Sequence, residues 1–321
     1  MIDVILLGCG ATMPAPGRGL SSVVLRCRGR SILFDCGEGT QVALQREKVS
    51  PLKIDLIALT HYHGDHLFGL PGLLQTMNCL KRTDPLVITG PEGLKEALEP
   101  ILKLAGQTDY EVRLDKLDAP FGVSMSTLNP KWADGTWFHR FPTAHRVPSQ
   151  GYSFHLIRRC KFLPEKAKAL GVPVSMWKQI IADDPAVPVR INGEILREGS
   201  HVVRGLDLME KPRKGLHVAI SGDTMPSRIL RSYAFSADLL IHDATYGDND
   251  QEAEAELWGH STFRQAAEIA RDAEVGQLWL THFLQSIKAP FDYLDNAKAV
   301  FPNTVCGYDG LTTTLHFENE S

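Results

Sequence analysis

The segment His61-Tyr62-His63-Gly64-Asp65-His66 decides how this sequence is interpreted. It follows the apolar stretch 56–60, which is typical of a strand, and it precedes a Gly- and Leu-rich stretch that can begin a helix. Four side chains that can bind a metal therefore lie at one strand-to-helix turn. Imidazole and carboxylate together suit zinc, which can activate water at neutral pH. The simpler alternative is a polar loop that is rich in histidine by chance, and partners further along the chain argue against it.

The cysteines do not accompany this cluster. A structural zinc site needs a closed ligand set, normally with cysteines, and none lies nearby. The chain has six scattered cysteines without a CxxC pair, and we expect most of them to be reduced and buried in a cytoplasmic protein. They are Cys9, Cys27, Cys36, Cys79, Cys160 and Cys306.

The composition of the 321 residues is ordinary for a globular protein, with 43% hydrophobic and 22% charged residues. The net charge of −4 gives no global basic field that would indicate nucleic-acid binding, although a local basic surface remains compatible with it. We see no signal peptide and no apolar run of the roughly 20 residues that cross a membrane. These features favour a cytoplasmic location.

Strands and helices are mixed in both halves of the chain, which predicts two packed sheets with helices outside. No clear linker divides it, so we expect one domain with an insertion. The predicted strands are 3–8, 21–27, 31–35, 56–60, 85–89, 137–142, 152–157, 217–221, 239–243, 278–281 and about 303–308. The predicted helices are about 40–47, 91–105, 226–235, 250–273 and 290–300, and 107–135 is left unassigned.

The insertion is predicted at 160–215. Five prolines interrupt it, at positions 164, 173, 185, 188 and 212, and Asn192-Gly193 predicts a hairpin turn. It carries ten Lys or Arg against seven Asp or Glu, so it is locally basic within an acidic chain. A solvated, irregular excursion is one interpretation. A segment that projects from the domain and binds a partner is the other.

Further candidate ligands stand at the ends of predicted strands. His145 follows strand 137–142, Asp223 follows strand 217–221, and His282 follows strand 278–281. Strand ends can bring distant positions together at one edge of a sheet. Any one of these residues alone would more often be structural, but together with the histidine cluster they indicate a metal site.

The ordered set resembles the signature of the metallo-β-lactamase superfamily, HxHxDH followed by His, Asp and His. The resemblance implies an α+β fold, a four-layer αββα sandwich, formed by a single domain over 1–321, with two zinc ions per chain. It also implies a ligand set in which Asp223 bridges the two ions. One ion is then held by His61, His63 and His145, and the other by Asp65, His66 and His282. Mn²⁺ or Fe²⁺ would also suit such ligands.

A narrower resemblance is to ribonuclease Z, the endonuclease that removes the 3′ trailer of precursor tRNA. It covers most of 1–90 and 137–310. It rests on the segments 7–11, 34–41 (FDCGEGTQ), 66–73 (HLFGLPGL), 145–152, 221–224, 242–245 and 259–262. The resemblance implies a zinc-dependent phosphodiesterase that acts on precursor tRNA. It also implies a homodimer, with the 160–215 insertion as a tRNA-binding arm.

The same resemblance suggests catalytic roles. Asp65 is expected to bind metal and accept the proton of water. His260 is expected to be the general acid for the leaving ribose oxygen, and Asp243, where the family has Glu, to orient it and raise its pKa. Asp35 and Glu38 are candidates to hold the imidazoles, or else ordinary carboxylates. Ser261 or Thr262 could also cap the helix that follows.

A small-molecule hydrolase of the same fold, such as a phosphodiesterase or an arylsulfatase-like enzyme, is the competing interpretation. The segment 259–262 and the basic insertion favour the endoribonuclease. The net charge and the composition of the insertion favour the alternative, because Ser175-Met176 stands where the family usually has Gly-Pro, and Asp183-Asp184 is acidic.

Overall fold

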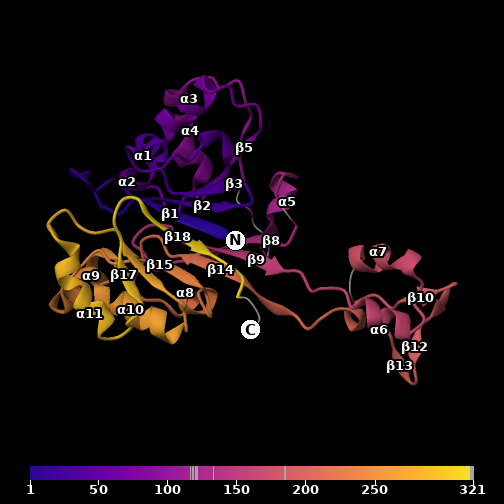
Figure 1. Ribbon diagram of the computed structural model, residues 1–321. Helices are drawn as coiled ribbons and strands as arrows, with labels where there is room; N and C mark the ends of the chain where they lie inside the picture. Colours follow the sequence, from indigo (N-terminus) through magenta and orange to yellow (C-terminus); the bar gives the residue numbers. More distant parts are fainter. Residues whose placement is uncertain (116, 118, 120–121, 133, 184–185, 319–321) are drawn as a thin grey trace. The chain divides into compact units, whose positions relative to one another are not determined.

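The computed structural model describes residues 1–115, 117, 119, 122–132, 134–183 and 186–318. The chain divides into two compact units, Met1–Leu156 with Leu216–Ser321, and Ile157–Gly215. The first unit contains two seven-stranded sheets, with helices on the outer face of each (Figure 1). The predicted αββα sandwich of two mixed sheets is confirmed.

The first sheet is built from strands whose side chains alternate between two apolar environments. Val4 and Leu6 of β1 face the second sheet, whereas Ile5 and Leu7 pack under helices α1, α3 and α4. Both faces are thus buried, as the near-continuous apolar runs predict. In spatial order the strands are β18 (Leu311–Leu315), β1 (Ile2–Gly8), β2 (Ser22–Cys27), β3 (Arg30–Phe34), β4 (Ile54–Ala58), β5 (Leu86–Thr89) and β6 (Val112–Leu114). The helices of this half are α1 (Thr40–Arg46), α2 (Gly64–Leu67), α3 (Leu70–Cys79) and α4 (Leu94–Ala105).

In the second sheet, four parallel strands stand beside an antiparallel hairpin. Helix α10 packs on the outer face through small residues, Ala266, Ala267 and Ala270, all fully buried. In spatial order the strands are β17 (Thr304–Cys306), β16 (Leu278–Thr281), β15 (Leu239–Asp243), β14 (Arg213–Ile220), β9 (Gln150–Arg158), β8 (Thr136–Pro142) and β7 (Val123–Ser124). The helices of this half are α5 (Met125–Leu128), α8 (Arg228–Tyr233), α9 (Glu252–Trp258), α10 (Phe263–Asp272) and α11 (Leu294–Lys298).

The helix predicted over 250–273 is wrong as a continuous element. Helix α9 ends at Trp258, because Gly259 adopts the left-handed conformation with φ 78°. Helix α10 then begins behind Thr262, whose side chain accepts a hydrogen bond from the Gln265 amide in a capping box. The break leaves His260 in an irregular segment between two helices.

Strand β18 was not predicted from the sequence, in which the last expected strand lies near 303–308. It pairs antiparallel with β1, from Ile2 opposite Leu315 to Leu6 opposite Leu311. Its three consecutive threonines lack the apolar run that identifies the other strands. The unassigned stretch 107–135 contains only short elements, β6, β7 and α5.

The unit Ile157–Gly215, here called the arm, has its own small core. Helices α6 (Pro164–Ala169) and α7 (Val174–Ala182) pack with two small hairpins around Ala167, Val172, Ile180, Val189, Val203 and Leu208. The hairpins are β10 (Arg190–Ile191) with β11 (Glu194–Ile195), and β12 (Arg197–Glu198) with β13 (His201–Val202). The turn predicted at Asn192-Gly193 is confirmed, with φ 51° and 86°. Asp184 and Pro185 lie outside the described residues.

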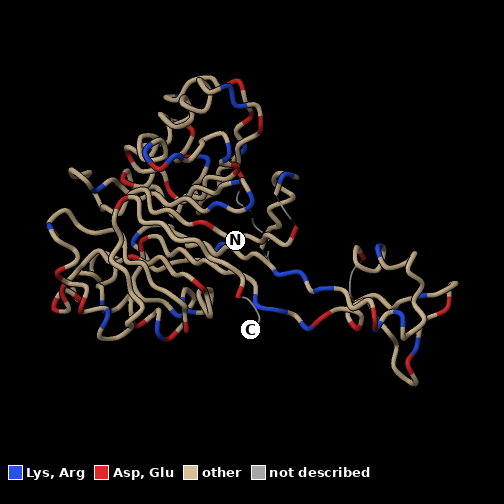
Figure 2. The backbone as a smooth tube through the Cα atoms, in the orientation of Figure 1, with Lys and Arg blue, Asp and Glu red and all other residues tan. Residues whose placement is uncertain are grey.

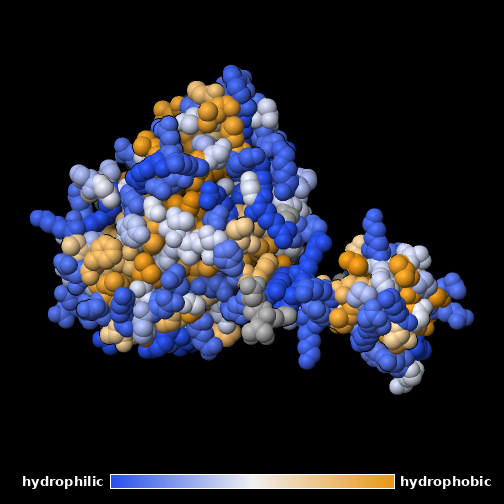
Figure 3. All heavy atoms as spheres, in the orientation of Figure 1, coloured by the Kyte–Doolittle hydropathy of each residue, from blue (hydrophilic) through white to orange (hydrophobic). Residues whose placement is uncertain are grey.

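The arm's surface carries both charges and apolar side chains. Lys and Arg alternate with Asp and Glu along its trace (Figure 2). Apolar patches lie among hydrophilic ones in Figure 3, and Val174, Ile181, Val187 and Leu206 are each at least half exposed. The arm therefore folds around its own core and has a partly apolar surface. This differs from the irregular, solvated segment that was one interpretation of the sequence.

The buried carboxylate of Asp55 joins two strands of the first sheet to the stretch after α5. Asp55 of β4 pairs with the Arg30 guanidinium, and both side chains are nearly inaccessible to solvent. Asp55 also accepts hydrogen bonds from Asn129 Nδ2 at 2.9 Å and Trp132 Nε1 at 2.8 Å. All three groups depend on one carboxylate that is almost completely buried.

We expect Asp55→Ala to lower the free energy of unfolding by about 3–5 kcal/mol, because it leaves the Arg30 charge buried without a partner. Urea denaturation followed by circular dichroism measures this. Asp272→Ala, which removes an exposed carboxylate paired with Arg271, is the control and should change stability by less than about 0.5 kcal/mol. A similar small loss in both variants would contradict the structural role of Asp55.

Candidate metal centre

Seven histidine and aspartate side chains converge where the strand ends of the two sheets meet. The segment after β4 supplies His61, His63, Asp65 and His66, the turn between β8 and β9 supplies His145, and the ends of β14 and β16 supply Asp223 and His282. Gly222 allows the close approach of the two sheets. Its φ is 62°, and a Cβ there would lie 2.6 Å from Thr60 Cβ.

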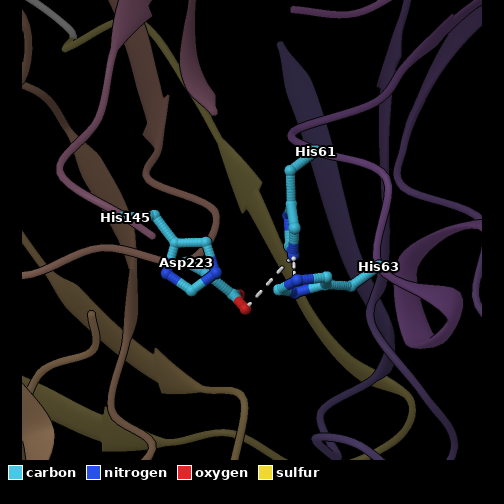
Figure 4. A group of neighbouring side chains, drawn as sticks. All are labelled: His61, His63, His145 and Asp223. Carbon is cyan, nitrogen blue, oxygen red and sulfur yellow. Dashed lines mark hydrogen bonds and ion pairs between the residues drawn. The ribbon is translucent and has the colours of Figure 1, made fainter. Parts of the chain in front are cut away.

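The first group contains His61, His63, His145 and Asp223, whose ligand atoms lie within 4.8 Å of one another (Figure 4). His61 Nε2 lies 2.9 Å from His63 Nδ1 and 3.6 Å from Asp223 Oδ2. Ligand atoms of a tetrahedral zinc site with bonds of 2.0–2.1 Å are about 3.3 Å apart. The spacing of this group is therefore that of atoms that can share one small cation.

The second group contains Asp65, His66 and His282. His282 Nε2 lies 3.2 Å from His66 Nε2 and 3.4 Å from Asp65 Oδ2. Asp223 also reaches this group, because its Oδ1 lies 3.4 Å from His66 Nε2 and its Oδ2 lies 3.3 Å from His282 Nε2. Asp223 thus stands between the two groups.

Hydrogen bonds behind the imidazoles set which nitrogen faces each group. His66 Nδ1 donates to Asp35 Oδ2 at 2.8 Å, His145 Nδ1 to the Gly259 carbonyl at 2.7 Å, and His282 Nδ1 to Thr245 Oγ1 at 2.8 Å. Each Nε2 is then left with its lone pair toward the centre. His145 Nε2 is buried with no hydrogen-bond partner among the described residues. A buried acceptor without a donor fits a metal ion, so the side chains present suit the divalent metal that the resemblance implies.

Asp35 and Glu38 were both candidates to hold the imidazoles, and among the described residues Asp35 makes such a hydrogen bond whereas Glu38 does not. Asp35 adopts φ 55°, a left-handed conformation that aspartate tolerates better than most residues. Its carboxylate accepts from His66 and from the amide and hydroxyl of Thr60, at 2.7 and 2.8 Å. Glu38 lines the cavity over the centre, and no hydrogen bond joins it to an imidazole of the described chain.

We expect Asp35→Asn to weaken metal affinity by about 10- to 100-fold, because the amide cannot stabilise the His66 ring as the carboxylate does. Competition with a chromophoric chelator measures the affinity. Glu38→Gln is the matched control, as it neutralises a nearby carboxylate that holds no ligand, and it should leave affinity within about twofold. If Glu38→Gln weakened binding as much as Asp35→Asn, general electrostatics would explain the loss.

His260 and Asp243 form a hydrogen-bonded pair beside the two groups. His260 Nδ1 lies 2.8 Å from Asp243 Oδ2, so the shorter aspartate reaches the imidazole directly. Asp243 also accepts from the Thr224 amide at 3.0 Å, and from the Thr245 amide and hydroxyl at 2.9 and 2.5 Å. Its oxygens are therefore occupied, which disfavours Asp243 as a metal ligand although it lies near His282. Burial lowers the pKa of His260, but the charge and hydrogen bond of Asp243 raise it to about 9.

An open cavity of ≈ 680 Å³ lies over the centre. Its floor includes Asp65, Asp223, His260 and His282, and its walls include Phe68, Arg146 and Trp258. No role was predicted for these three wall residues, although Phe68 and Arg146 stand in the segments 66–73 and 145–152 that carry the family resemblance. The available signal for Trp258 was its position two residues before the candidate acid.

Comparison with known proteins places this site in a family. Residues 15–132 match the metallo-β-lactamase superfamily. A ribonuclease Z of Lachnospira eligens is 37% identical over 321 residues, covering 100% of both chains. One of Clostridium acetobutylicum is 38% identical over 319 residues, covering 99% of this chain and 100% of the relative. The chain belongs to the ribonuclease Z family. As a family member it is a metal-dependent hydrolase that cleaves phosphodiester bonds.

Solved structures agree with the ribonuclease Z fold. The short form of human tRNase Z is 27% identical, with a TM-score of 0.66, and the match covers 98% of this chain and 100% of that one. A diphosphatase of the PhnP family matches with a TM-score of 0.62 at 15% identity, covering 100% of both chains. The second likeness shows the fold alone and identifies no substrate.

Proposed function

We propose that this protein removes the 3′ trailer of precursor tRNA as a zinc-dependent endoribonuclease. The identity of 37–38% to ribonucleases Z over 99–100% of the chain supports an activity on tRNA. The convergence of seven ligand side chains beside the His260–Asp243 pair supports phosphodiester hydrolysis at this site. The competing small-molecule hydrolase lacks comparable support, because the diphosphatase likeness concerns only the fold.

Two metal ions would be held by the seven converging side chains. His61, His63 and His145 would bind one ion, Asp65, His66 and His282 the other, and Asp223 both. Zinc bound there would supply a Lewis acid for the phosphate and lower the pKa of water. The donor set of imidazoles and carboxylates also accepts Mn²⁺ or Fe²⁺, so metal analysis of the purified protein decides the ion.

Side chains of the protein itself would carry out the two proton transfers of the reaction. Asp65 Oδ2 accepts a hydrogen bond from the Thr12 amide at 2.6 Å, which holds the carboxylate toward the cavity, where it can accept a proton from the attacking water. On His260, Nδ1 is engaged by Asp243, so Nε2 is the atom that can carry a proton to the leaving ribose oxygen. Asp243 thereby sets the tautomer and the direction of the imidazole.

We expect the wild-type enzyme to cleave precursor tRNA at the start of its 3′ trailer, and His260→Ala to slow this cleavage by about 100- to 10,000-fold. Hydrolysis of bis(p-nitrophenyl) phosphate should fall far less, because nitrophenolate leaves without a proton. Single-turnover assays on both substrates measure the difference, with the metal content of the variant checked. Equal losses on both substrates would mean that His260 binds the substrate or supports the structure of the site and does not donate a proton. A wild-type enzyme that is inactive on precursor tRNA would overturn the proposed function.

The arm is proposed as a tRNA-binding element. It contains none of the predicted ligands, and it holds an excess of Lys and Arg in an otherwise acidic chain. Strands β9 and β14, which lead into and out of it, are neighbours in the second sheet, so a short linker can join them. The first unit also keeps a separate core.

Replacing 160–215 by a short Gly/Ser linker should raise the apparent KM for precursor tRNA by at least about 10-fold, and weaken the dependence of KM on salt. Turnover of bis(p-nitrophenyl) phosphate is the internal control and should persist, since the metal ligands lie outside the segment. Steady-state kinetics at several salt concentrations tests this. Unchanged tRNA cleavage at every salt concentration would refute the tRNA-binding role of the arm.

We also propose a cytoplasmic homodimer. The dimer rests on the family resemblance, and sedimentation equilibrium measures it. The location rests on the six free cysteines, which suit a reducing compartment. No described helix combines the length and the apolar character needed to span a membrane.

A further inference from the structure

The cavity over the metal centre holds few positive charges for a site that receives a polyanion. The carboxylates of Glu38, Asp65 and Asp223 line it, and among the described lining residues Arg146 is the one Lys or Arg. Metal ions can neutralise the phosphate that is cut, but each neighbouring nucleotide brings another negative charge. A permanent cation on the wall is therefore placed to meet the phosphate next along the strand.

Arg146 is held by stacking rather than by an ion pair. Its Cζ lies 4.7 Å from the centroid of the Trp258 ring, in the arrangement of a cation–π contact. The described part of the chain shows no hydrogen bond or salt bridge to its guanidinium. Because no described acceptor takes its N–H groups, the planar donors of the guanidinium are available to match a phosphate.

The backbone beneath the pair is shared with the catalytic groups. A Cβ on Gly259 would lie 3.2 Å from Arg146 Cγ and 2.9 Å from His145 Nδ1, so Gly259 packs closely against both residues. Gly259 also accepts the His145 hydrogen bond, and His260 follows it directly. The position of Arg146 is thus set by the same two segments that place a candidate ligand and the candidate acid.

We propose that Arg146, braced by Trp258, binds a phosphate of the RNA strand adjacent to the bond that is cut. The inference rests on the proposed function and assigns to this pair the preference for a polynucleotide over a small phosphodiester. Trp258 is 48% exposed and Arg146 is exposed, so the contact adds little to folding. Trp258 acts through Arg146 and is a positioning residue.

The test compares Arg146→Gln with Arg271→Gln, which removes the same charge from an exposed position on α10 away from the cavity. Arg146→Gln should raise the KM for precursor tRNA about 10-fold with kcat changed less than about threefold, because a charged hydrogen bond to phosphate is lost. The slope of log KM against log salt should fall by about 0.7–0.9. Arg271→Gln should match the wild type, and an Arg146→Gln enzyme that does so too would overturn the proposal.

Substitutions of Trp258 test whether its ring acts by positioning Arg146 or by contacting RNA directly. Trp258→Leu should raise KM about threefold, Trp258→Phe should restore most of the loss, and the double variant with Arg146→Gln should be no worse than Arg146→Gln alone. Additive losses would mean that Trp258 contacts RNA on its own, against its role as a brace.

Failure of the proposed function is distinguishable from failure of this inference. Precursor tRNA can be added as an inhibitor of bis(p-nitrophenyl) phosphate hydrolysis by the intact metal-loaded enzyme, and its inhibition constant reports binding even without cleavage. A wild-type enzyme that binds but does not cleave tRNA would refute the function alone. An inhibition constant that Arg146→Gln leaves unchanged would refute the role of Arg146.

Discussion

The carboxylate of Asp223 is the group on which the rest of the site depends. It comes from the second sheet, is 3% exposed, and its two oxygens lie 3.3–3.6 Å from imidazoles of His61, His66 and His282. A buried carboxylate needs positive charge near both oxygens, and here those charges must come from protonated imidazoles or from metal ions. The five imidazoles, three from the loop of the first sheet and those of His145 and His282 from the second, would repel one another if all were protonated. Metal ions bound there would satisfy the carboxylate and the imidazoles at once, so metal binding and the docking of the two sheet edges would support each other.

The convergence of the seven candidate ligands could be predicted from the sequence because each of them stands in a recognisable local pattern. The run 61–66 is contiguous, and His145, Asp223 and His282 each follow a recognisable apolar strand. Parallel strands β14, β15 and β16 then bring their carboxyl ends to one edge without further information. The contact of Asp243 with His260 could be predicted only through the family resemblance, because 17 residues separate the two partners in the sequence.

Features that depend on a single backbone conformation were not predictable. One left-handed residue, Gly259, divides the helix expected over 250–273 and so places His260 at the cavity. Likewise, Asp35 and Glu38 look equivalent in sequence, but the left-handed backbone of Asp35 turns its carboxylate toward His66. Arg146 and Trp258 lie 112 residues apart, and no local sequence pattern predicts their contact. Strand β18 was missed because its threonines give no apolar period, and its place at the sheet edge comes from pairing with β1.

The pairing of β18 with β1 links the first sheet to a distant part of the sequence. One of the two neighbours of β1 is a strand that follows all seven candidate ligands along the chain. Asp309, just before β18, also accepts hydrogen bonds from the amides of Cys9 and Gly19, which flank the loop whose Thr12 amide holds Asp65. The loop that holds Asp65 is therefore fixed in part by residues that follow every candidate ligand in the sequence. A chain cut before Asp309 would keep all seven side chains and lose this support.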